Sequence, residues 1–237
     1  MTMISIIIPC YNEEATVYPL LEKVAAQTLA SLNVEREIVV VDDGSTDRSL
    51  EQIWLFRDRH PALPLKVLSN SPRLGKGWSV RKALEAAQGE IILIQDADLE
   101  YDPSDYEALM RPVLLGVTPV VYGSRWLAPE IHISGTLALL GGWLENRLLH
   151  TLYRTNISDI ATGYKVFRAD LLRSLNLDCR GFEFCPEVTA KLLNRGVTII
   201  EEPIHYIPRN KREGKKIRWP DFFIAVATLV RVRFKRL

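Results

Sequence analysis

The sequence predicts an α/β fold with a mostly parallel, Rossmann-like central sheet flanked by helices. As far as Arg125, short runs of β-branched residues alternate with segments of helical periodicity, which is the order of βαβ units. Three of the runs end abruptly in acidic residues, a pattern typical of buried strands that deliver their carboxyl ends to a ligand-binding edge. The 237 residues, 47% hydrophobic and 25% charged, are enough for one sizeable globular core.

The first half of the chain predicts five strands separated by helices. The strands are Ile4 to Ile8, Glu37 to Val41, Leu65 to Ser69, Glu90 to Ile94 and Pro119 to Tyr122. The helices are Glu14 to Leu29, Asp47 to Arg59, Lys76 to Ala87, and one that opens at Asp102, Pro103 and Ser104 and runs to Leu115. Gly89 is expected to stop the third helix, and the side chain of Asp102 is expected to cap the fourth.

The second half predicts longer amphipathic helices and one further strand pair. The helices are Gly135 to Tyr153, Asp170 to Leu175, Pro186 to Arg195 and Trp219 to Phe234, and the strand pair lies near Val197 to Ile207. We therefore divide the chain into a domain of residues 1–218 and a basic, amphipathic C-terminal helix within residues 219–237. Aromatic and basic residues on that last helix suit a membrane surface, but a helix that packs its apolar face on the domain has the same pattern.

The bulk composition argues against several classes of protein. A net charge of +1 gives no global argument for nucleic-acid binding, although basic residues concentrate in the last quarter of the chain. Cys10, Cys179 and Cys185 match neither a zinc site nor a disulfide framework, so reduced thiols in a cytoplasmic setting are expected. There is no signal-like leader and no apolar window of roughly 18 residues, so we expect the chain not to cross a membrane.

The most informative segment is the acidic run Gln95 to Pro103, which directly follows the apolar run Ile91 to Ile94. If extended geometry persists beyond the strand, Asp96, Asp98 and Glu100 face the same way. Carboxylates at this density suit Mg²⁺ or Mn²⁺, which complete their coordination with water and substrate phosphates. Like charges placed so close together are costly without a cation. The alternative is an acidic loop that leads into a helix cap.

Two other strand ends carry polar side chains to the same edge. Tyr11 can stack on a nucleobase and Glu13 can accept hydrogen bonds from a base or ribose, although a helix N-terminus with acids in its first turn is the alternative. Asp42 and Asp43 stand side by side before a turn at Gly44, where turn chemistry alone needs only one of them. At least one is therefore expected to hold a base or ribose, and the three acidic strand ends together predict a single crevice.

Basic residues are expected to face this crevice as anion ligands. The turn formed by Arg73, Gly75, Lys76 and Gly77 precedes a helix, and helix N-termini bind anions. Its glycine spacing fits neither the Walker nor the dinucleotide-binding fingerprint. Arg125 follows the fifth strand and can contact a phosphate, with a salt bridge to the acidic run as the alternative.

The motifs at the strand ends form a set that extends along the whole chain. In the first half they are PCYNEE, VVVDDGSTD, GKGWSVRKALEAAQGEIILIQDADLEYDP and GSR. The second half continues with SDIATGYKVFR, GFEFCPEVTAKLLNRG and EEPIHYIPRNKREGKKIRW. Together they resemble glycosyltransferase family 2, and most closely its dolichyl-phosphate and polyprenyl-phosphate sugar synthases, which include dolichol-phosphate mannosyltransferase-like enzymes.

The resemblance implies a GT-A fold and an inverting, metal-dependent hexose transfer. The donor would be a nucleotide-sugar such as GDP-mannose or a UDP-sugar, the cofactor Mg²⁺ or Mn²⁺, and the acceptor a polyprenyl or dolichyl phosphate. Carried onto this sequence, the donor-binding residues are Pro9, Tyr11, Glu13, Val41, Asp43, Asp96, Ala97, Asp98, Arg125, Arg209 and Lys215. The resemblance further assigns Asp98 and Glu100 to the metal. It assigns Asp96 and Arg125 to catalysis.

A lipid phosphate acceptor determines the chemistry that we expect. Such an acceptor is already an anion at neutral pH, so the reaction needs positioning and charge neutralisation more than a general base. Lys165 and Arg168 are candidates to hold the acceptor phosphate, with Arg168 at the surface end of a strand as the alternative for that residue. A lipid acceptor also requires attachment at the membrane, here expected at its cytoplasmic face, which gives the helices Gly135 to Tyr153 and Trp219 to Phe234 a purpose.

Two other functions stay open at this point. A family 2 enzyme that acts on a soluble saccharide or a protein side chain would need a general base for the acceptor hydroxyl, and Asp159 and Glu187 are the candidates. The non-enzymatic alternative is a nucleotide-binding partner subunit, which the intact acidic run does not favour. The sequence leaves the oligomeric state open.

Overall fold

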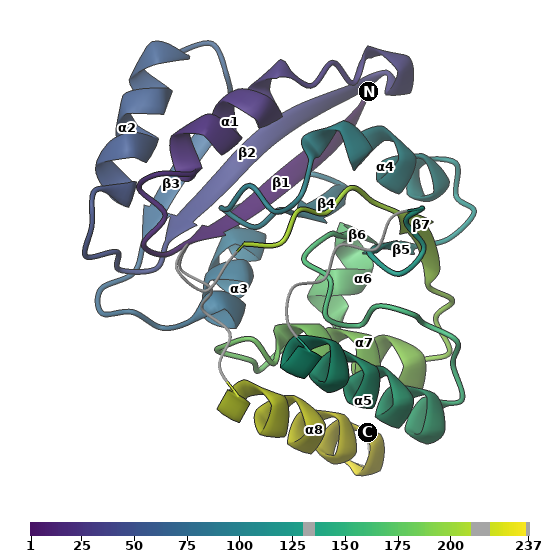
Figure 1. Ribbon diagram of the computed structural model, residues 1–237. Coiled ribbons are helices and arrows are strands. Elements are labelled where there is room, and N and C mark those ends of the chain that lie inside the picture. The colour runs from purple at the N-terminus through teal and green to yellow at the C-terminus, as the bar shows by residue number, and fades with distance from the viewer. Residues whose placement is uncertain (130–135, 210–218, 236–237) are drawn as a thin grey trace.

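A computed structural model describes residues 1–129, 136–209 and 219–235 of the chain. One mixed sheet of seven strands has the order β3-β2-β1-β4-β6-β5-β7 and carries helices on both faces (Figure 1). The predicted α/β class, with a mostly parallel sheet between layers of helices, is confirmed.

The strands fall into a parallel set and one antiparallel insertion. They are β1 (Thr2–Cys10), β2 (Val34–Asp42), β3 (Leu65–Ser69), β4 (Ile91–Ile94), β5 (Val120–Ser124), β6 (Lys165–Arg168) and β7 (Ile200–Pro203). All strands predicted in the first half are present, β3 with the predicted ends and the others with shifted ends, whereas β6 was not predicted and runs antiparallel between β4 and β5. The predicted strand pair near Val197 to Ile207 is wrong. Within the described residues, this stretch contributes β7, parallel to β5, and a single bridge from Tyr206 to Tyr101.

The helices follow the predicted order closely. They are α1 (Val17–Ala26), α2 (Ser49–Arg59), α3 (Lys76–Ala86), α4 (Tyr106–Leu114), α5 (Thr136–Tyr153), α6 (Ala169–Ser174), α7 (Phe184–Asn194) and α8 (Trp219–Phe234), with short 3-10 turns η1 (Ala30–Leu32) and η2 (Pro103–Asp105). The predicted cap at Asp102 is confirmed, because its carboxylate accepts a hydrogen bond from the Ser104 amide at 2.9 Å. Cys10, Cys179 and Cys185 are not joined by disulfide bonds in the described structure.

Alternation along the strands divides the core into two layers. Ile4, Ile6 and Ile8 of β1 pack with α1, α2 and α4, whereas Ile7 packs with α3 and the helices of the second half. Every residue of β4 is buried, since helices cover both faces of the sheet at that point. The two layers fix where the strands end, and so they position the loops that follow.

Helices α5, α7 and α8 lie together at one side of the molecule (Figure 1). The inner face of α8 is buried through Ala225, Leu229 and Val232, and the Tyr153 hydroxyl of α5 donates to the Leu229 carbonyl at 2.7 Å. The inner face of α8 therefore packs on the domain, which was the alternative to membrane binding for this helix. Large apolar side chains on the outer faces are exposed, namely Leu140, Trp143, Leu144, Trp219, Phe223, Ile224, Val230 and Phe234. Among the described residues, no helix is both long and apolar enough to cross a membrane.

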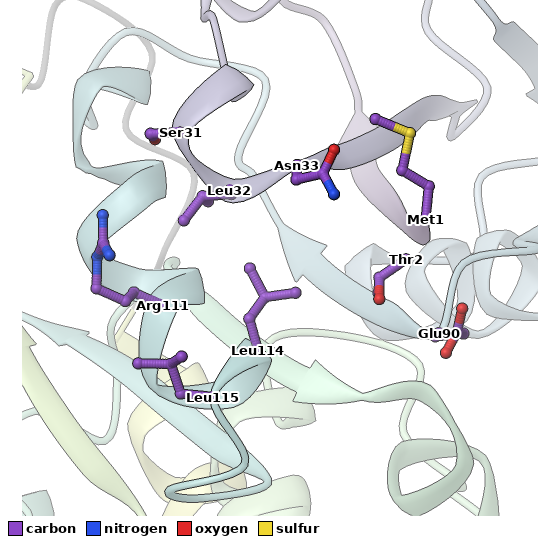
Figure 2. Close-up of a pocket in the computed structure, with 9 residues that line it drawn as sticks. All are labelled: Met1, Thr2, Ser31, Leu32, Asn33, Glu90, Arg111, Leu114 and Leu115. Carbon is purple, nitrogen blue, oxygen red and sulfur yellow. The ribbon is translucent and has the colours of Figure 1, made fainter.

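A cavity of about 460 Å³ opens at the amino edge of the sheet, where β1 begins (Figure 2). Its lining is mixed in character and consists of Met1, Thr2, Ser31, Leu32, Asn33, Glu90, Arg111, Leu114 and Leu115. The acidic strand ends all lie at the opposite, carboxyl edge, because β1, β2 and β4 run parallel. The cavity is thus separate from the predicted crevice.

Candidate active site

Three strand ends meet at the carboxyl edge of the sheet, as predicted. The chain leaves β1 after Cys10, and the Asp43 amide beyond β2 donates to the Cys10 carbonyl at 2.7 Å. The Gln95 amide, immediately after β4, donates to the Ile7 carbonyl at 2.9 Å. Parallel pairing therefore gathers the polar residues after all three strands into one region, the usual place for ligands in open α/β sheets.

Glu13, Asp98 and Glu100 form a buried group at this edge, which we call the carboxylate cluster. Arg209 lies among them, with Nη2 2.6 Å from Asp98 Oδ2, Nη1 3.0 Å from Glu13 Oε2 and Nε 3.6 Å from Glu100 Oε1. The Arg209 backbone amide also donates to Glu100 Oε1 at 2.8 Å. The four side chains are only 8 to 16% exposed, so the guanidinium offsets part of the negative charge of three carboxylates in a largely dry environment.

Burial and mutual repulsion disfavour the ionised form of these carboxylates unless a positive charge lies beside them. The pKa of Asp98 is raised to about 7, first by burial and then by repulsion from Asp96 and Glu100, while the Arg209 guanidinium opposes the rise. Burial disfavours a charged Arg209, yet Asp98, Glu13 and Glu100 outweigh burial and raise the pKa of its guanidinium. The carboxylates therefore favour the charged form of Arg209, and Arg209 favours the charged form of Asp98.

The residues present fit a divalent cation, although the arrangement differs from the expected one. Asp98 and Glu100 offer hard oxygen atoms that a positive charge must balance, which is the donor chemistry that Mg²⁺ and Mn²⁺ prefer. In the part of the chain that the structure describes, no three His, Cys, Asp or Glu side chains are placed to hold one metal ion together, so Glu13 is not counted with Asp98 and Glu100 as a ligand. The extended geometry does not persist beyond Ile94, and Asp96 pairs with Lys76 instead of joining the cluster.

The ion pair between Lys76 and Asp96 links the acidic run to the start of α3. Lys76 is the first residue of α3 and follows Gly75, whose φ of +103° is a conformation that side chains rarely adopt. Burial disfavours the Lys76 ammonium, but Asp96 reverses the effect and raises its pKa. The turn that was predicted to bind an anion thus holds a carboxylate of the chain itself.

The residues predicted for the nucleoside lie next to one another at the ends of β1 and β2. Pro9 and Val41 are paired in register, and the Arg73 guanidinium stacks 3.9 Å above the ring of Tyr11. Asp43 is 3% exposed and accepts hydrogen bonds that tie the following loop to β2. Its donors are the Leu74 amide at 2.9 Å, the Gly75 amide at 2.8 Å and the Asn70 side-chain amide at 2.8 Å. Asp43 therefore fixes the loop from Asn70 to Gly75 against the end of β2.

Ala97 lies between Asp96 and the carboxylate cluster. It is buried, and its carbonyl accepts a hydrogen bond from the Thr16 hydroxyl at 3.1 Å. The same hydroxyl lies 2.7 Å from Glu13 Oε2, so Thr16 ties the loop after β4 to the cluster.

Arg125 pairs with Asp159 and not with the acidic run. Its Nε and Nη2 donate to the two carboxylate oxygens of Asp159 at 2.7 Å each, and its amide donates at 3.0 Å. Burial opposes a charged Asp159, but Arg125 outweighs it and holds the pKa of that carboxyl below its usual value. The guanidinium also lies 5.1 Å from the ring of Tyr206, whose hydroxyl donates to Glu100 at 3.1 Å. One ring thus separates Arg125 from the carboxylate cluster.

Both candidate general bases are held by other groups. Asp159 is bound bidentately by Arg125, and its amide donates to Glu201 at 2.9 Å. Glu187 is fully buried, accepts from the amides of Asp178 and Cys179, and pairs with Lys191 at 2.6 Å. Neither carboxylate is arranged to take a proton from an acceptor hydroxyl in this structure.

The structure corrects the assignment of Lys165 and Arg168 to the acceptor phosphate. Lys165 is fully buried and donates to the carbonyls of Ile160 at 2.9 Å and Thr162 at 2.6 Å, and burial lowers the pKa of its ammonium. Arg168 is aligned with Ile91 at the beginning of β4, which places it at the amino edge of the sheet. There it is exposed and pairs with Asp170. Lys215 lies outside the described residues.

The sequence did not indicate how the segment before Arg209 reaches the site. The amide of Ile207 donates to the Glu100 carbonyl at 2.8 Å, and His205 binds Asp105 through its amide at 2.8 Å and its ring at 2.7 Å. These contacts join residues about one hundred positions apart in the chain, a pairing that local patterns do not reveal. They fix the backbone on the N-terminal side of Arg209 against the loop that follows β4.

Comparison with known proteins gives a consistent family. A model described as glycosyl transferase family 2 matches residues 5–175. A dodecaprenyl-phosphate galacturonate synthase of Rhizobium johnstonii is 26% identical over 77% of this chain and 53% of its own length. A low-salt glycan biosynthesis hexosyltransferase of Haloferax volcanii is 30% identical over 92% of this chain and 51% of its length. A dolichol-phosphate mannosyltransferase of Pyrococcus furiosus is 26% identical over 90% of this chain and 58% of its length. The chain thus spans about half the length of the curated relatives it matches.

The solved structures agree on the fold. Glucosyl-3-phosphoglycerate synthase from Mycobacterium tuberculosis, in complex with Mn²⁺, UDP and phosphoglyceric acid, superposes with a TM-score of 0.74 at 21% identity. The match covers 100% of this chain and 80% of that one. The arrangement of the sheet and its helices is therefore the GT-A fold that the motifs imply.

Proposed function

The chain belongs to glycosyl transferase family 2, and from that premise we propose that it transfers a hexose from a nucleotide-sugar to a polyprenyl or dolichyl phosphate. The transfer would invert the anomeric carbon and use Mg²⁺ or Mn²⁺. The observation that carries the proposal is the buried carboxylate cluster, which gathers three acids around one cation at the ligand-binding edge of the sheet. The names of the relatives from R. johnstonii and P. furiosus, which specify lipid phosphates, support the acceptor class.

We assign Asp98 and Glu100 to the metal. A divalent ion held there would act as a Lewis acid and neutralise the charge that develops on the departing nucleoside diphosphate. The complex of the M. tuberculosis enzyme with Mn²⁺ and UDP supports this choice of cofactor and donor. The nucleoside of the donor would lie against Pro9, Tyr11, Glu13, Val41, Asp43 and Ala97.

The other charged side chains that we assign to the donor are Arg209, Arg125, Lys215 and Asp96. Arg209 and Lys215 would bind phosphate oxygens, and Arg125, which Asp159 holds bidentately in this structure, would add a positive charge at the same edge. Asp96, fixed by Lys76, would orient the donor beside the leaving diphosphate. Fixed charges aimed at a developing anion act strongly where water is excluded, as at this buried edge.

A phosphate acceptor suits this site better than a hydroxyl. A phosphate monoester is already ionised at neutral pH, whereas a sugar or protein hydroxyl needs a base to remove its proton. Asp159 and Glu187, the two candidate bases, are both bound by cations and backbone amides. The site instead offers cations that could position an anionic nucleophile.

The outer faces of α5 and α8 are proposed to bring the protein to a lipid acceptor. The two helices pack side by side (Figure 1). Each carries an exposed tryptophan, Trp143 on α5 and Trp219 on α8. Tryptophan and neighbouring apolar side chains favour the interface between lipid headgroups and hydrocarbon. We therefore propose peripheral attachment at the cytoplasmic face of a membrane, with residues 219–237 as part of the attachment surface.

A soluble, phosphate-bearing acceptor is the second candidate. The M. tuberculosis complexes contain phosphoglyceric acid, which offers a small anion at a GT-A site. The cationic groups that would position a lipid phosphate could position such a molecule equally well. A nucleotide-binding subunit without activity is less favoured, since the acidic run that would hold the metal is intact.

The test is a transfer assay with the purified full chain, Mn²⁺, radiolabelled GDP-mannose or UDP-sugars, and either polyprenyl phosphate in detergent or phosphoglyceric acid. We expect label to enter the organic phase only with polyprenyl phosphate and only with metal. Asp98→Asn should abolish the transfer, whereas Asp102→Asn, which alters another acid of the same run but keeps the helix cap, should not. Label that appears only in water-soluble product would refute the lipid acceptor.

A further inference from the structure

Arg209 occupies the place where the proposed metal ligands converge. Its Nη2 lies 2.6 Å from Asp98 and its Nε lies 3.6 Å from Glu100, the two residues assigned to the metal. Its Nη1 reaches Glu13 at 3.0 Å, so the guanidinium contacts every member of the carboxylate cluster.

We propose that Arg209 is the internal counter-ion of the carboxylate cluster, and that its guanidinium and the divalent metal bind the cluster alternately. Metal binding then releases the guanidinium, which becomes available to the diphosphate of the donor. The inference rests on the proposed function, because it takes Asp98 and Glu100 as the metal ligands.

Space and charge together make the two cations exclusive. A divalent metal would need the Asp98 and Glu100 oxygens that now surround the guanidinium, and its coordinated waters need room as well. With both cations present, a guanidinium and a divalent ion would repel each other at close range in a poorly screened environment. With neither present, the neighbouring carboxylates of Asp98 and Glu100 would repel each other in a poorly screened environment.

The backbone around Arg209 allows its side chain to move alone. The Ile207 amide is hydrogen-bonded to the Glu100 carbonyl, and His205 is anchored on Asp105, so the chain up to this point is tied down. The four rotatable bonds of an arginine can then swing the guanidinium while its Cα stays beside the cluster. A planar guanidinium that is released at this edge can bind two phosphate oxygens at once.

This exchange couples the metal to the nucleotide. Metal alone must displace Arg209 from three carboxylates, so it binds weakly. Metal together with a nucleoside diphosphate binds more tightly, because the diphosphate offers the displaced guanidinium a new anion. Coupling between two ligands is reciprocal, so metal and nucleotide should each strengthen the binding of the other.

Calorimetric titration of the full chain with Mn²⁺ alone tests the exchange. Removing the competing cation in Arg209→Gln should tighten the Mn²⁺ dissociation constant at least about fivefold, the lower range of measured couplings between sites. Arg111→Gln removes an arginine from an exposed pair with Glu107 and should leave Mn²⁺ binding unchanged. Equal or weaker Mn²⁺ binding by Arg209→Gln would overturn the inference, and so would a failure of both proteins to bind Mn²⁺.

A second measurement needs no variant and so does not depend on the folding of Arg209→Gln. Wild-type protein is labelled with an arginine-selective dicarbonyl reagent, and the modified residues are quantified by mass spectrometry with and without Mn²⁺. Mn²⁺ should increase labelling of Arg209 several-fold and leave Arg111 unchanged, whereas equal labelling of Arg209 would contradict the exchange. Neither readout involves an acceptor, so a negative transfer assay would refute the proposed acceptor and leave the exchange to stand on the metal data.

Discussion

Both edges of the central sheet carry arginine–carboxylate pairs, but the pairs are built differently. At the carboxyl edge, Arg209 and Arg125 are 16% and 17% exposed and pair with acids distant in the sequence. At the amino edge, Arg111 and Arg168 are 51% and 58% exposed and pair with acids on their own segment. Exposed local pairs contribute little to stability, whereas breaking a buried pair leaves an uncompensated charge. The comparison indicates that the functional charges are those at the carboxyl edge.

The largest expected effect follows from replacing Asp98. Asp98→Asn keeps the shape of the side chain but removes one of the two proposed metal ligands and one of the three partners of Arg209. We expect the transfer rate to fall by at least about 100-fold, as when a group that stabilises transition-state charge is lost. The rate is measured with saturating donor. A variant that retains a tenth of the wild-type rate or more would place the metal elsewhere.

The next effect concerns the pair of Arg125 and Asp159. Arg125→Gln leaves Asp159 buried without its bidentate partner, and the free energy of unfolding should fall by about 3–5 kcal/mol. Urea denaturation measures the change. The matched control is Arg168→Gln at the amino edge, for which we expect no measurable change. Similar losses in both variants would remove the distinction between the two edges.

A smaller effect is expected for Lys165, a buried lysine that does not reach the crevice. Lys165→Met leaves the carbonyls of Ile160 and Thr162 without their donor, which should cost about 1–3 kcal/mol of stability. The KM for the acceptor should stay at its wild-type value, because the ammonium points into the core. A KM that rises tenfold with unchanged kcat would restore Lys165 as an acceptor ligand.

The smallest effect concerns pH and the contact of His205 with Asp105. The hydrogen bond to Asp105 raises the pKa of His205 above its ordinary value of 6.5, while burial raises the pKa of Asp105 despite its bond to the imidazole. A raised histidine pKa means that the stabilisation is present below pH 6.5 and is lost as pH rises through the higher folded value. Wild type should therefore exceed His205→Gln in stability at pH 6 and lose that advantage towards alkaline pH. An advantage that grows with pH in urea titrations would show the opposite linkage.

Strand positions were largely predictable, because buried strands show as short runs of β-branched residues. β6 escaped prediction because its place between β4 and β5 depends on antiparallel pairing with both, which no local pattern indicates. The prediction of a strand pair near Val197 to Ile207 was wrong for a related reason. After Pro203 the backbone bonds to Glu100 and Asp105 instead of to a second strand.

The site was predictable where it depends on strand ends, and not where it depends on pairing at a distance. The acids after β1, β2 and β4 share one edge because parallel strands require it. Arg209 and Glu13 are 196 residues apart, and no local pattern indicates their contact. Lys165 and Arg168 belong to one strand, and its antiparallel direction carries Arg168 away from the crevice. Lys165 lies at the crevice end of the strand, but it is buried and donates to the Ile160 and Thr162 carbonyls, contacts that the sequence did not indicate.

The most direct test of the account is to locate Mn²⁺ by anomalous X-ray scattering in crystals grown with Mn²⁺ and either GDP or UDP. We predict a peak between the carboxylates of Asp98 and Glu100 and next to the diphosphate, with the Arg209 guanidinium moved away from Asp98. A peak at any other group of residues, or a metal-bound structure in which Arg209 still contacts all three carboxylates, would contradict the account.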